Sequence, residues 1–138
     1  MSENFRIALL RIKAKALTVR KRIEEFRPIQ SSDKVLEVGS GAHGLVFGFE
    51  DVTSFGLDPL AVEYHSLFPL WQDQVDTIAA IGEELPFEDD YFEVVLSDNV
   101  VDHAADPVKI MHELVRVLKP NGILYFSVNT HHPVYQTI

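Results

Sequence analysis

The feature that most constrains the fold is an alternation of strand-like and helix-like segments that begins at Lys34. Apolar runs rich in β-branched and aromatic residues predict strands, and helical spacing between them predicts crossover helices. The predicted strands are KVLEVG (34–39), TSFGLD (53–58), VDTIAAI (75–81), FEVVLSD (92–98) and ILYFSV (123–128). Because strands that alternate with helices form parallel sheets with right-handed crossovers, we predict an α/β fold with about five mostly parallel strands.

Two Asp-Pro pairs mark the starts of helices between these strands. Asp is a favoured N-cap and Pro is favoured at the first helical position. Asp58-Pro59 is therefore predicted to begin a helix that runs to about Phe68, and Asp106-Pro107 to begin another. A short helix is expected around residues 45–49. The predicted buried face of the last helix consists of Val108, Met111, Leu114, Val115 and Leu118.

The first 30 residues have the pattern of a single amphipathic helix. Apolar residues recur at intervals of three and four, which places one apolar stripe along about six helical turns. The stripe consists of Phe5, Leu9, Ile12, Ala16, Val19, Ile23 and Phe26. Pro28 ends the pattern because proline disfavours helical geometry at the preceding residue. We therefore divide the chain into an N-terminal amphipathic helix (1–30) and a core domain (31–138).

Charge is distributed unevenly along the chain. The net charge is −9, yet residues 1–34 hold nine of the twelve Lys and Arg and only four of the 21 Asp and Glu. The acidic remainder disfavours nucleic acid as a partner, because phosphates are also anionic. The basic helix is expected to pack on the domain. A coiled coil or a membrane-surface role is the alternative, and the basic residues could contact an anionic surface or the acidic body of their own chain or of a neighbour.

Composition excludes several classes of protein. The chain has no Cys, which excludes disulfides, thiolate metal sites and cysteine nucleophiles, and no metal site is predicted. No apolar stretch approaches the roughly 18 residues that span a bilayer. The N-terminus MSENFRIALL lacks the basic run and the long apolar core of a signal peptide. We expect a cytoplasmic protein without a membrane span.

The stretch VLEVGSGAHG (35–44) runs from a predicted strand into Gly39, Gly41 and Gly44, which are spaced G-x-G-x-x-G. The spacing alone is a weak signal, but here it lies between a strand and a helix. Asp58 follows 19 residues after Gly39, at the end of the next strand. Bare glycines let a ligand lie against backbone N–H groups, and a carboxylate accepts hydrogen bonds from two adjacent ribose hydroxyls. The pattern predicts a nucleotide-type ligand at the carboxyl ends of the strands.

Two classes of nucleotide-type ligand fit this turn. Nicotinamide cofactors carry a pyrophosphate, whereas S-adenosylmethionine carries an amino-acid group and a sulfonium. Glu37, two places before Gly39, would repel a pyrophosphate and suits a positively charged amino group. The short helix after the turn, interrupted by Gly48, is also a poor phosphate anchor. These residues favour S-adenosylmethionine, and a dinucleotide-binding dehydrogenase is the competing interpretation.

Four stretches of the sequence carry a resemblance to a known family. They are VLEVGSGAHG (35–44), FGLDP (55–59), GEELPFEDDYFEVVLSDNVVDHAADP (82–107) and IMHELVRVLKPNGILYFSV (110–128). In this order they resemble the class I S-adenosylmethionine-dependent methyltransferases, most closely the small-molecule branch that includes the ubiquinone-biosynthesis type. The resemblance covers most of residues 35–128 and implies a Rossmann-like doubly wound sheet.

The resemblance also implies which residues bind S-adenosylmethionine. Those implied for the methionine part and the ribose are Glu37, Gly39, Gly41, Asp58 and Pro59. Those implied for the adenine and for the pocket near the methyl group are Gly82, Glu83, Asp98 and Asn99. The chain departs from the family at Ile81, where an acid usually pairs with the adenine amino group. An isoleucine can only pack on the ring, so backbone groups of Gly82 and Glu83 would have to substitute.

The implied function is methyl transfer to a small-molecule acceptor by in-line displacement. Because the sulfonium is already activated, the protein mainly positions the reactants and excludes water. A base is required only where the acceptor must lose a proton. His131, after the last strand, and His103 are the predicted catalytic residues, since histidine titrates near neutral pH. The alternative is a non-catalytic cofactor-binding or interaction module that kept the fold.

About ten residues follow the last predicted strand, whereas the sheet of this family normally closes with two further strands. The fifth strand is therefore expected to present an apolar edge, which invites pairing. Three arrangements would account for it. The chain is a fragment of a longer enzyme, it forms a homodimer through this edge or through the N-terminal helix, or the basic helix covers the gap.

Overall fold

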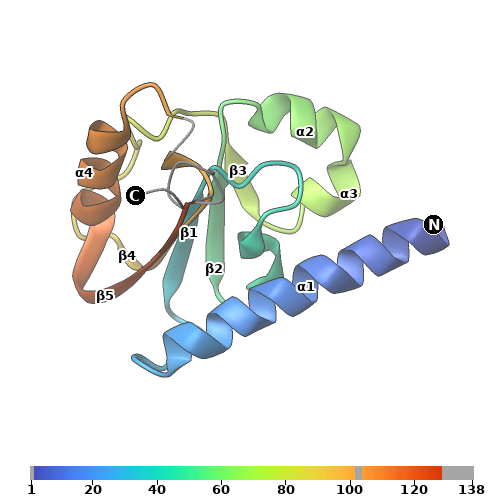
Figure 1. The fold of residues 1–138 in the computed structure, drawn as a ribbon, viewed down its shortest axis with the longest axis horizontal. Helices are drawn as coiled ribbons and strands as arrows, with labels where there is room; N and C mark the ends of the chain where they lie inside the picture. Colours follow the sequence, from blue (N-terminus) through green and yellow to red (C-terminus); the bar gives the residue numbers. More distant parts are fainter. Residues whose placement is uncertain (1, 102–103, 129–138) are drawn as a thin grey trace, which may run out of the picture.

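The computed structural model describes residues 2–101 and 104–128. Five parallel strands form one sheet in the order β3-β2-β1-β4-β5. The strands are β1 (Lys34–Val38), β2 (Thr53–Leu57), β3 (Asp76–Ile78), β4 (Phe92–Asp98) and β5 (Leu118–Ser127). The helices are α1 (Glu3–Glu24), the 3-10 helix η1 (Leu45–Gly48), α2 (Ala61–Leu67), α3 (Pro69–Gln72) and α4 (Pro107–Val117). The predicted Rossmann-like α/β sheet is confirmed (Figure 1).

The strand order reverses between β1 and β4. From β1 the chain adds β2 and β3 on one side of the sheet and then crosses to place β4 and β5 on the other. Both central strands are buried, β1 from Val35 to Val38 and β4 from Phe92 to Ser97. In open α/β sheets, ligands bind beyond the carboxyl ends of the strands at such a reversal. The glycine turn follows β1 at this point.

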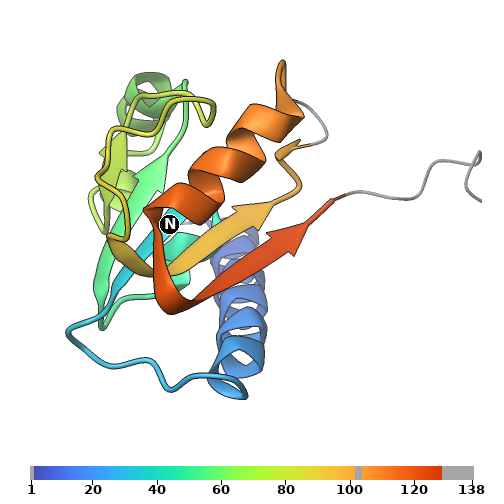
Figure 2. The same cartoon turned by 90° about the vertical axis from the view of Figure 1, so that its left-hand side faces the viewer.

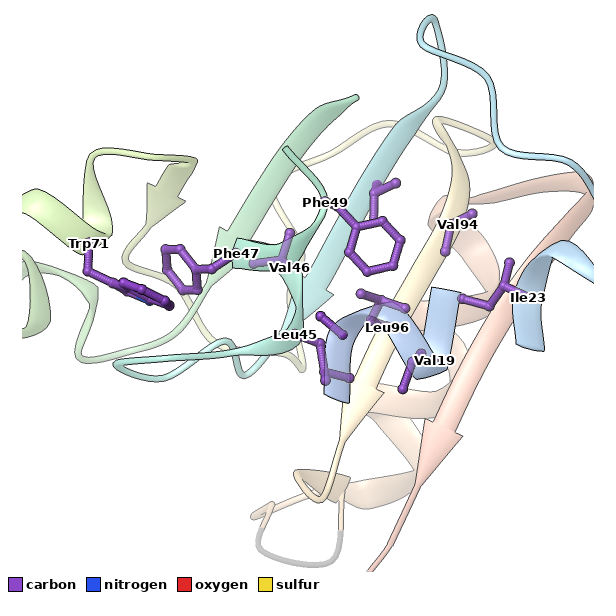
Figure 3. Packing of buried hydrophobic residues seen from close by; sticks show 11 residues of the cluster. Val19, Ile23, Leu45, Val46, Phe47, Phe49, Trp71, Val94 and Leu96 are labelled. Atoms are coloured by element: carbon purple, nitrogen blue, oxygen red, sulfur yellow. The ribbon is translucent and has the colours of Figure 1, made fainter. Parts of the chain in front are cut away.

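Helices α1 and α4 cover opposite faces of the sheet (Figure 2). Alternate residues of a strand point to opposite faces, so Val35 of β1 packs in the core with α1, whereas Leu36 packs with α4. Figure 3 shows the core on the α1 face, where Val19 and Ile23 lie against the side chains of β4. The N-terminal helix is therefore an integral layer of the domain.

The predicted apolar stripe of α1 is confirmed for most of its length. Ala16, Val19 and Ile23 are buried, and the stripe residues before Ala16 are partly buried against the same core. Gly48 allows this close packing, because a Cβ at Gly48 would lie 2.3 Å from the Cβ of Ala16. The prediction is wrong for Phe26, which is 79% exposed because the helix ends at Glu24 before the stripe reaches it.

Ion pairs join the basic helix α1 to acidic residues of the core domain. Lys13 Nζ lies 2.7 Å from Glu50 Oε1, and Lys15 Nζ lies 2.8 Å from Asp98 Oδ2. Arg20 pairs with Asp51 in the loop after η1. The basic helix is thus held over the acidic body of its own chain, as one of the alternatives from the sequence anticipated.

Helix α4 begins where the sequence predicts, but its buried face is only partly the predicted one. Leu114 is buried as predicted, and Met111 and Leu118 pack partly buried against the same core. The Asp106 side chain accepts a hydrogen bond from Lys109 N at 3.1 Å, which caps the helix at Pro107. Val108 and Val115, predicted to be buried, are 66% and 61% exposed. The buried residues are Ile110, Leu114 and Val117. Their spacing of four and three is also helical, so periodicity alone did not identify the face that meets the sheet.

Strand β5 pairs with β4 and lies at the edge of the sheet. Helix α1 contacts the face of β5, where Ile23 and Phe26 border a groove of about 240 Å³ over Ile123 and Tyr125. Within the part of the chain that the structure describes, no strand covers the outer edge of β5. Across those same residues, none of the helices has the combination of length and apolar character that crossing a bilayer requires.

Candidate functional site

The glycine turn is built on left-handed backbone that glycine adopts readily. Gly39 has φ +78° and Gly41 has φ +58°, a region that L-residues with a Cβ rarely occupy. The N–H groups of Gly39 and Ser40 both donate to Leu57 O, at 2.7 and 3.1 Å. These bonds fold the turn over the carboxyl end of β2. The left-handed positions explain why glycines stand at residues 39 and 41.

Two side chains, half-buried Asp58 and buried Gln72, hold the turn by hydrogen bonds to its backbone. Asp58 Oδ2 accepts from Gly41 N at 3.1 Å. Gln72 of α3, only 1% exposed, donates through Nε2 to Ala42 O at 2.8 Å and to Gly41 O at 3.3 Å. Gln72 was missed from the sequence, because a lone Gln in a short helix carries no local signal of a partner 30 residues away.

Glu37 lies beneath the turn. It is 1% exposed, and its Oε1 accepts from Val46 N at 2.9 Å. Burial, opposed by hydrogen bonds from the backbone of Val46 and Leu45, raises the pKa of Glu37 to about 8. A Cβ at Gly44 would lie 2.3 Å from Glu37 Oε1, so the third glycine makes room for this carboxyl group.

A pocket of about 390 Å³ lies at the carboxyl ends of β1, β2 and β4. Its lining residues are Val38, Gly39, Leu57, Asp58, Pro59, Ile81, Gly82, Glu83, Asn99, Val100, Ala104, Ala105 and Ile110. Most of them are apolar, and the polar side chains among them are those of Asp58, Glu83 and Asn99. Small-molecule sites commonly combine apolar walls with a few such polar groups.

The structure brings most of the predicted cofactor residues together in this pocket. Gly39, Asp58, Pro59, Gly82, Glu83 and Asn99 all line it. Glu37, Gly41 and Asp98 do not line it. Gly41 lies in the turn held by Asp58, whereas Glu37 lies below the turn. The roles assigned to all nine residues stay predictions.

Asp58 takes part in both the pocket wall and the helix start. Its Oδ1 accepts from Leu60 N at 2.9 Å, and its carbonyl oxygen accepts from Ala61 N at 3.1 Å. Helix α2 begins at Ala61. The prediction that Pro59 is the first helical residue is therefore wrong by two positions, because Asp58 caps a turn that precedes the helix.

Asp98 points away from the pocket toward α1. Its Oδ2 accepts from Lys15 Nζ at 2.8 Å, and its Oδ1 accepts from the Ser127 hydroxyl. Burial alone would raise the pKa of Asp98, but the hydrogen bonds from Lys15 and Ser127 and the charge of Lys15 lower it. Asp98 is therefore ionised at neutral pH.

A sequence profile described as "Methyltransferase domain" matches residues 36–126, which include the glycine turn and the whole sheet except the start of β1 and the last residue of β5. The chain belongs to the methyltransferase domain family. The class I fold predicted from the resemblance is confirmed by this match and by the solved structures below. The narrower resemblance to the ubiquinone-biosynthesis branch stays a prediction.

Curated relatives of this methyltransferase domain come from mycobacteria. An uncharacterized methyltransferase of Mycobacterium leprae is 34% identical over 96 residues, which are 67% of this chain and 36% of the relative. One from Mycolicibacterium vanbaalenii is 34% identical over 101 residues, which are 71% of this chain and 40% of the relative. The chain thus spans well under half the length of these relatives.

Solved structures share the fold of this methyltransferase domain. The YcgJ protein of Bacillus subtilis has a TM-score of 0.67 and 27% identity, and the alignment covers 80% of this chain and 49% of that one. A phosphoethanolamine N-methyltransferase of Haemonchus contortus, in complex with phosphomonomethylethanolamine and S-adenosylhomocysteine, has a TM-score of 0.63 and 25% identity. That alignment covers 80% of this chain and 27% of the other.

The two histidines predicted to act in methyl transfer, His103 and His131, lie outside the described residues. His43, in the glycine turn, packs against the rings of Phe68 and Trp71 at centroid distances of 4.8 and 5.3 Å. Ile81 lines the pocket and is 50% exposed. Among the described residues of this methyltransferase domain, the titratable side chains that line the pocket are those of Asp58 and Glu83.

Proposed function

We propose that this chain is the cofactor-binding core of an S-adenosylmethionine-dependent methyltransferase that acts on a small-molecule acceptor. The observation that carries the proposal is the pocket of about 390 Å³ at the ends of β1, β2 and β4, where residues from separate parts of the predicted motif meet. Membership of the methyltransferase domain family supports the same cofactor.

The pocket residues suit the adenosyl part of the cofactor. Leu57, Ile81 and Ile110 supply apolar surface for a flat adenine ring. Each Asp58 carboxylate oxygen accepts one backbone N–H in the protein and has a second lone pair for a ribose hydroxyl. Backbone groups of Gly82 and Glu83 are the candidates to pair with the adenine edge, since Ile81 has no polar atom in its side chain.

When bound, S-adenosylmethionine supplies an activated methyl group on a sulfonium. The protein's part is to hold the two reactants in line and to exclude water. Gly39 and Gly41 present bare backbone, and Asn99 lies at the pocket wall. His131 and His103 remain our candidates for removing a proton from an acceptor that must lose one.

A small-molecule acceptor is supported by one structural neighbour. The Haemonchus contortus enzyme was solved with phosphomonomethylethanolamine, a small amine. The acidic body of the present chain also makes a polyanionic acceptor unfavourable. From that enzyme we infer only the class of methyl acceptor for this chain, a small molecule.

The test is calorimetric titration of the chain with S-adenosylhomocysteine, with NADH as the matched control. We expect saturable heat with S-adenosylhomocysteine and none with NADH. A co-crystal should then place the adenosine between Asp58 and Ile81. Binding of NADH alone would support the dehydrogenase interpretation and overturn ours.

The alternative is a non-catalytic cofactor-binding or interaction module that kept the fold, and the titration tests the interaction module. It draws support from the glycine turn, because both Asp58 oxygens already bond to backbone N–H groups and Val100 packs against Gly39. If neither ligand produces heat, the alternative stands and the enzymatic proposal fails.

A further inference from the structure

An ion pair joins the N-terminal helix to the end of the central strand β4. Lys15 Nζ donates to Asp98 Oδ2 at 2.8 Å, across 83 residues of sequence. The Lys15 side chain is 59% exposed and that of Asp98 is 21% exposed. Ion pairs this exposed contribute only about 0–1 kcal/mol to stability. This ion pair therefore contributes little to the stability of the fold, and its importance lies in where it holds the Asp98 carboxylate.

Packing fixes the place from which Lys15 reaches Asp98. Its neighbour Ala16 is 1% exposed and lies so close to η1 that Gly48 has no room for a Cβ. On the other side, the Ser127 hydroxyl donates to Asp98 Oδ1. The carboxylate is thus held between α1 and β5, with one oxygen bonded to each.

The residues after Asp98 form a wall of the pocket. Asn99 has a left-handed φ of +63°, and its N–H donates to Ser127 O at 2.8 Å. Val100 packs so tightly on Gly39 that a Cβ there would lie 2.2 Å from Val100 Cγ2. Asn99 and Val100 both line the pocket. A shift at Asp98 would consequently be transmitted to the contact between this wall and the glycine turn.

We propose that Lys15 is a positioning residue for the cofactor pocket, which acts by anchoring the turn Asp98–Val100 through the Asp98 carboxylate. Lys15 does not line the pocket. Its hydrogen bond to Asp98 is the contact that reaches the pocket wall, and its charge also acts on Glu37 beneath the glycine turn. The inference rests on the proposed function only for the identity of the ligand. The anchoring itself is a property of the folded chain and is measurable without ligand.

The same helix provides a matched control. Lys13 also lies on α1 and pairs with a carboxylate, Glu50, at 2.7 Å, with both side chains exposed. Glu50 lies in the loop after η1 and does not line the pocket. Lys13→Met therefore removes an equivalent charge and an equivalent ion pair without touching the end of β4.

The first experiment measures S-adenosylhomocysteine affinity by calorimetry. We expect Lys15→Met to weaken binding about three- to tenfold, the scale of a lost charged hydrogen bond acting indirectly. Lys15→Arg should restore it, and Lys13→Met should stay within about twofold of wild type. In an Asp98→Asn background, Lys15→Met should weaken binding by a smaller factor than it does in wild type, because the effects of coupled residues are not additive. Equal losses for both Lys→Met variants would overturn the proposal.

The second experiment needs no ligand. NMR amide exchange should show faster exchange at Asn99 and Val100 in Lys15→Met than in wild type, and no change at these amides in Lys13→Met. Unchanged exchange in Lys15→Met overturns the anchoring, whatever the affinities are. Faster exchange in a chain that binds no S-adenosylhomocysteine keeps the anchoring and rejects the proposed function instead.

Discussion

Glu37 and Asp58 both flank the glycine turn, one before it and one after, yet their surroundings differ. Glu37 is 1% exposed, accepts a hydrogen bond from Val46 N and has its pKa raised to about 8, mainly by burial. Asp58 lines the pocket and accepts hydrogen bonds from Gly41 N and Leu60 N. The first supports the turn from below, and the second lies where a ligand can reach it.

The difference follows from which face of a strand each residue occupies. Glu37 lies two residues after Val35, and both therefore point toward the α1 face of the sheet. Asp58 lies beyond the end of β2, where alternation no longer applies. Two acids near one glycine motif can therefore have separate roles, one in folding and one in binding.

The largest expected effect is on folding stability. Glu37→Ala removes the acceptor of a buried N–H and leaves a cavity, so we expect the free energy of unfolding to fall by about 3 kcal/mol. Urea denaturation at about pH 6 measures this. Glu37→Gln keeps the acceptor and should lose less than half as much. A loss below about 1 kcal/mol for Glu37→Ala would show that the turn does not depend on this side chain.

The next effect is on the pH dependence of stability. The pKa of Glu37 is raised in the folded state to about 8 from 4.5. The folded chain therefore keeps a proton that the unfolded chain releases, and the contribution of Glu37 is full below about pH 4.5 and lost as pH rises toward 8. The free energy of unfolding of Glu37→Gln, relative to that of wild type at the same pH, should therefore rise by about 2 kcal/mol as pH increases from about 6 to 7.5.

Glu93 serves as the control for this measurement. Burial opposes ionisation of Glu93, but bonds from Lys119 and from the backbone N–H of Lys34 lower its pKa. Glu93 therefore stabilises the fold above its ordinary pKa and loses that contribution as pH falls. Glu93→Gln should show no trend between about pH 6 and 7.5, where Glu93 is ionised in both states, and should recover stability relative to wild type as pH falls below about 4.5. A rise in Glu93→Gln between about pH 6 and 7.5 like that of Glu37→Gln would contradict our account of Glu37.

For Asp58 the expected effect is on binding. Asp58→Ala should weaken S-adenosylhomocysteine binding at least tenfold, or about 1.4 kcal/mol, the scale of a lost charged hydrogen bond. Asp106→Ala is the matched control, because Asp106 is also followed by a proline and also accepts a hydrogen bond from a backbone N–H, but it does not line the pocket. Both variants should lose about 1 kcal/mol of stability. Unchanged affinity in Asp58→Ala would remove the ribose assignment.

The smallest expected effect concerns Ile81. Ile81→Asp places a carboxylate at a half-exposed position of the pocket wall, where it can accept a hydrogen bond from an adenine amino group. We expect affinity for S-adenosylhomocysteine to rise about threefold, because a hydrogen bond in a partly hydrated site contributes only a fraction of its full free energy. Ile81→Ala removes packing without adding an acceptor and should weaken binding. Equal losses of affinity in Ile81→Asp and Ile81→Ala would indicate that the adenine ring binds away from Ile81.

Local signals accounted for much of the fold and part of the site. Strand β4 has the bounds predicted from FEVVLSD, and α4 starts at the predicted Asp106-Pro107 pair. Alternation along a strand also indicates that Glu37 shares a face with Val35, which could have separated its role from that of Asp58. Such features depend on neighbours in the chain, and the sequence displays them directly.

Tertiary contacts decided the rest. The sequence could not show that Gln72 holds the glycine turn or that Lys15 pairs with Asp98, since these partners lie 30 and 83 residues apart. It also misjudged part of the buried face of α4, where Leu114 is buried as predicted but Val108 is exposed and Ile110 is buried. The sequence by itself determined the order of the five strands and the presence of α1 and α4, because periodicity and capping are local, but it did not predict α3 or the start of β5 at Leu118. Only the folded structure determined which surfaces meet, because that depends on how the elements pack together.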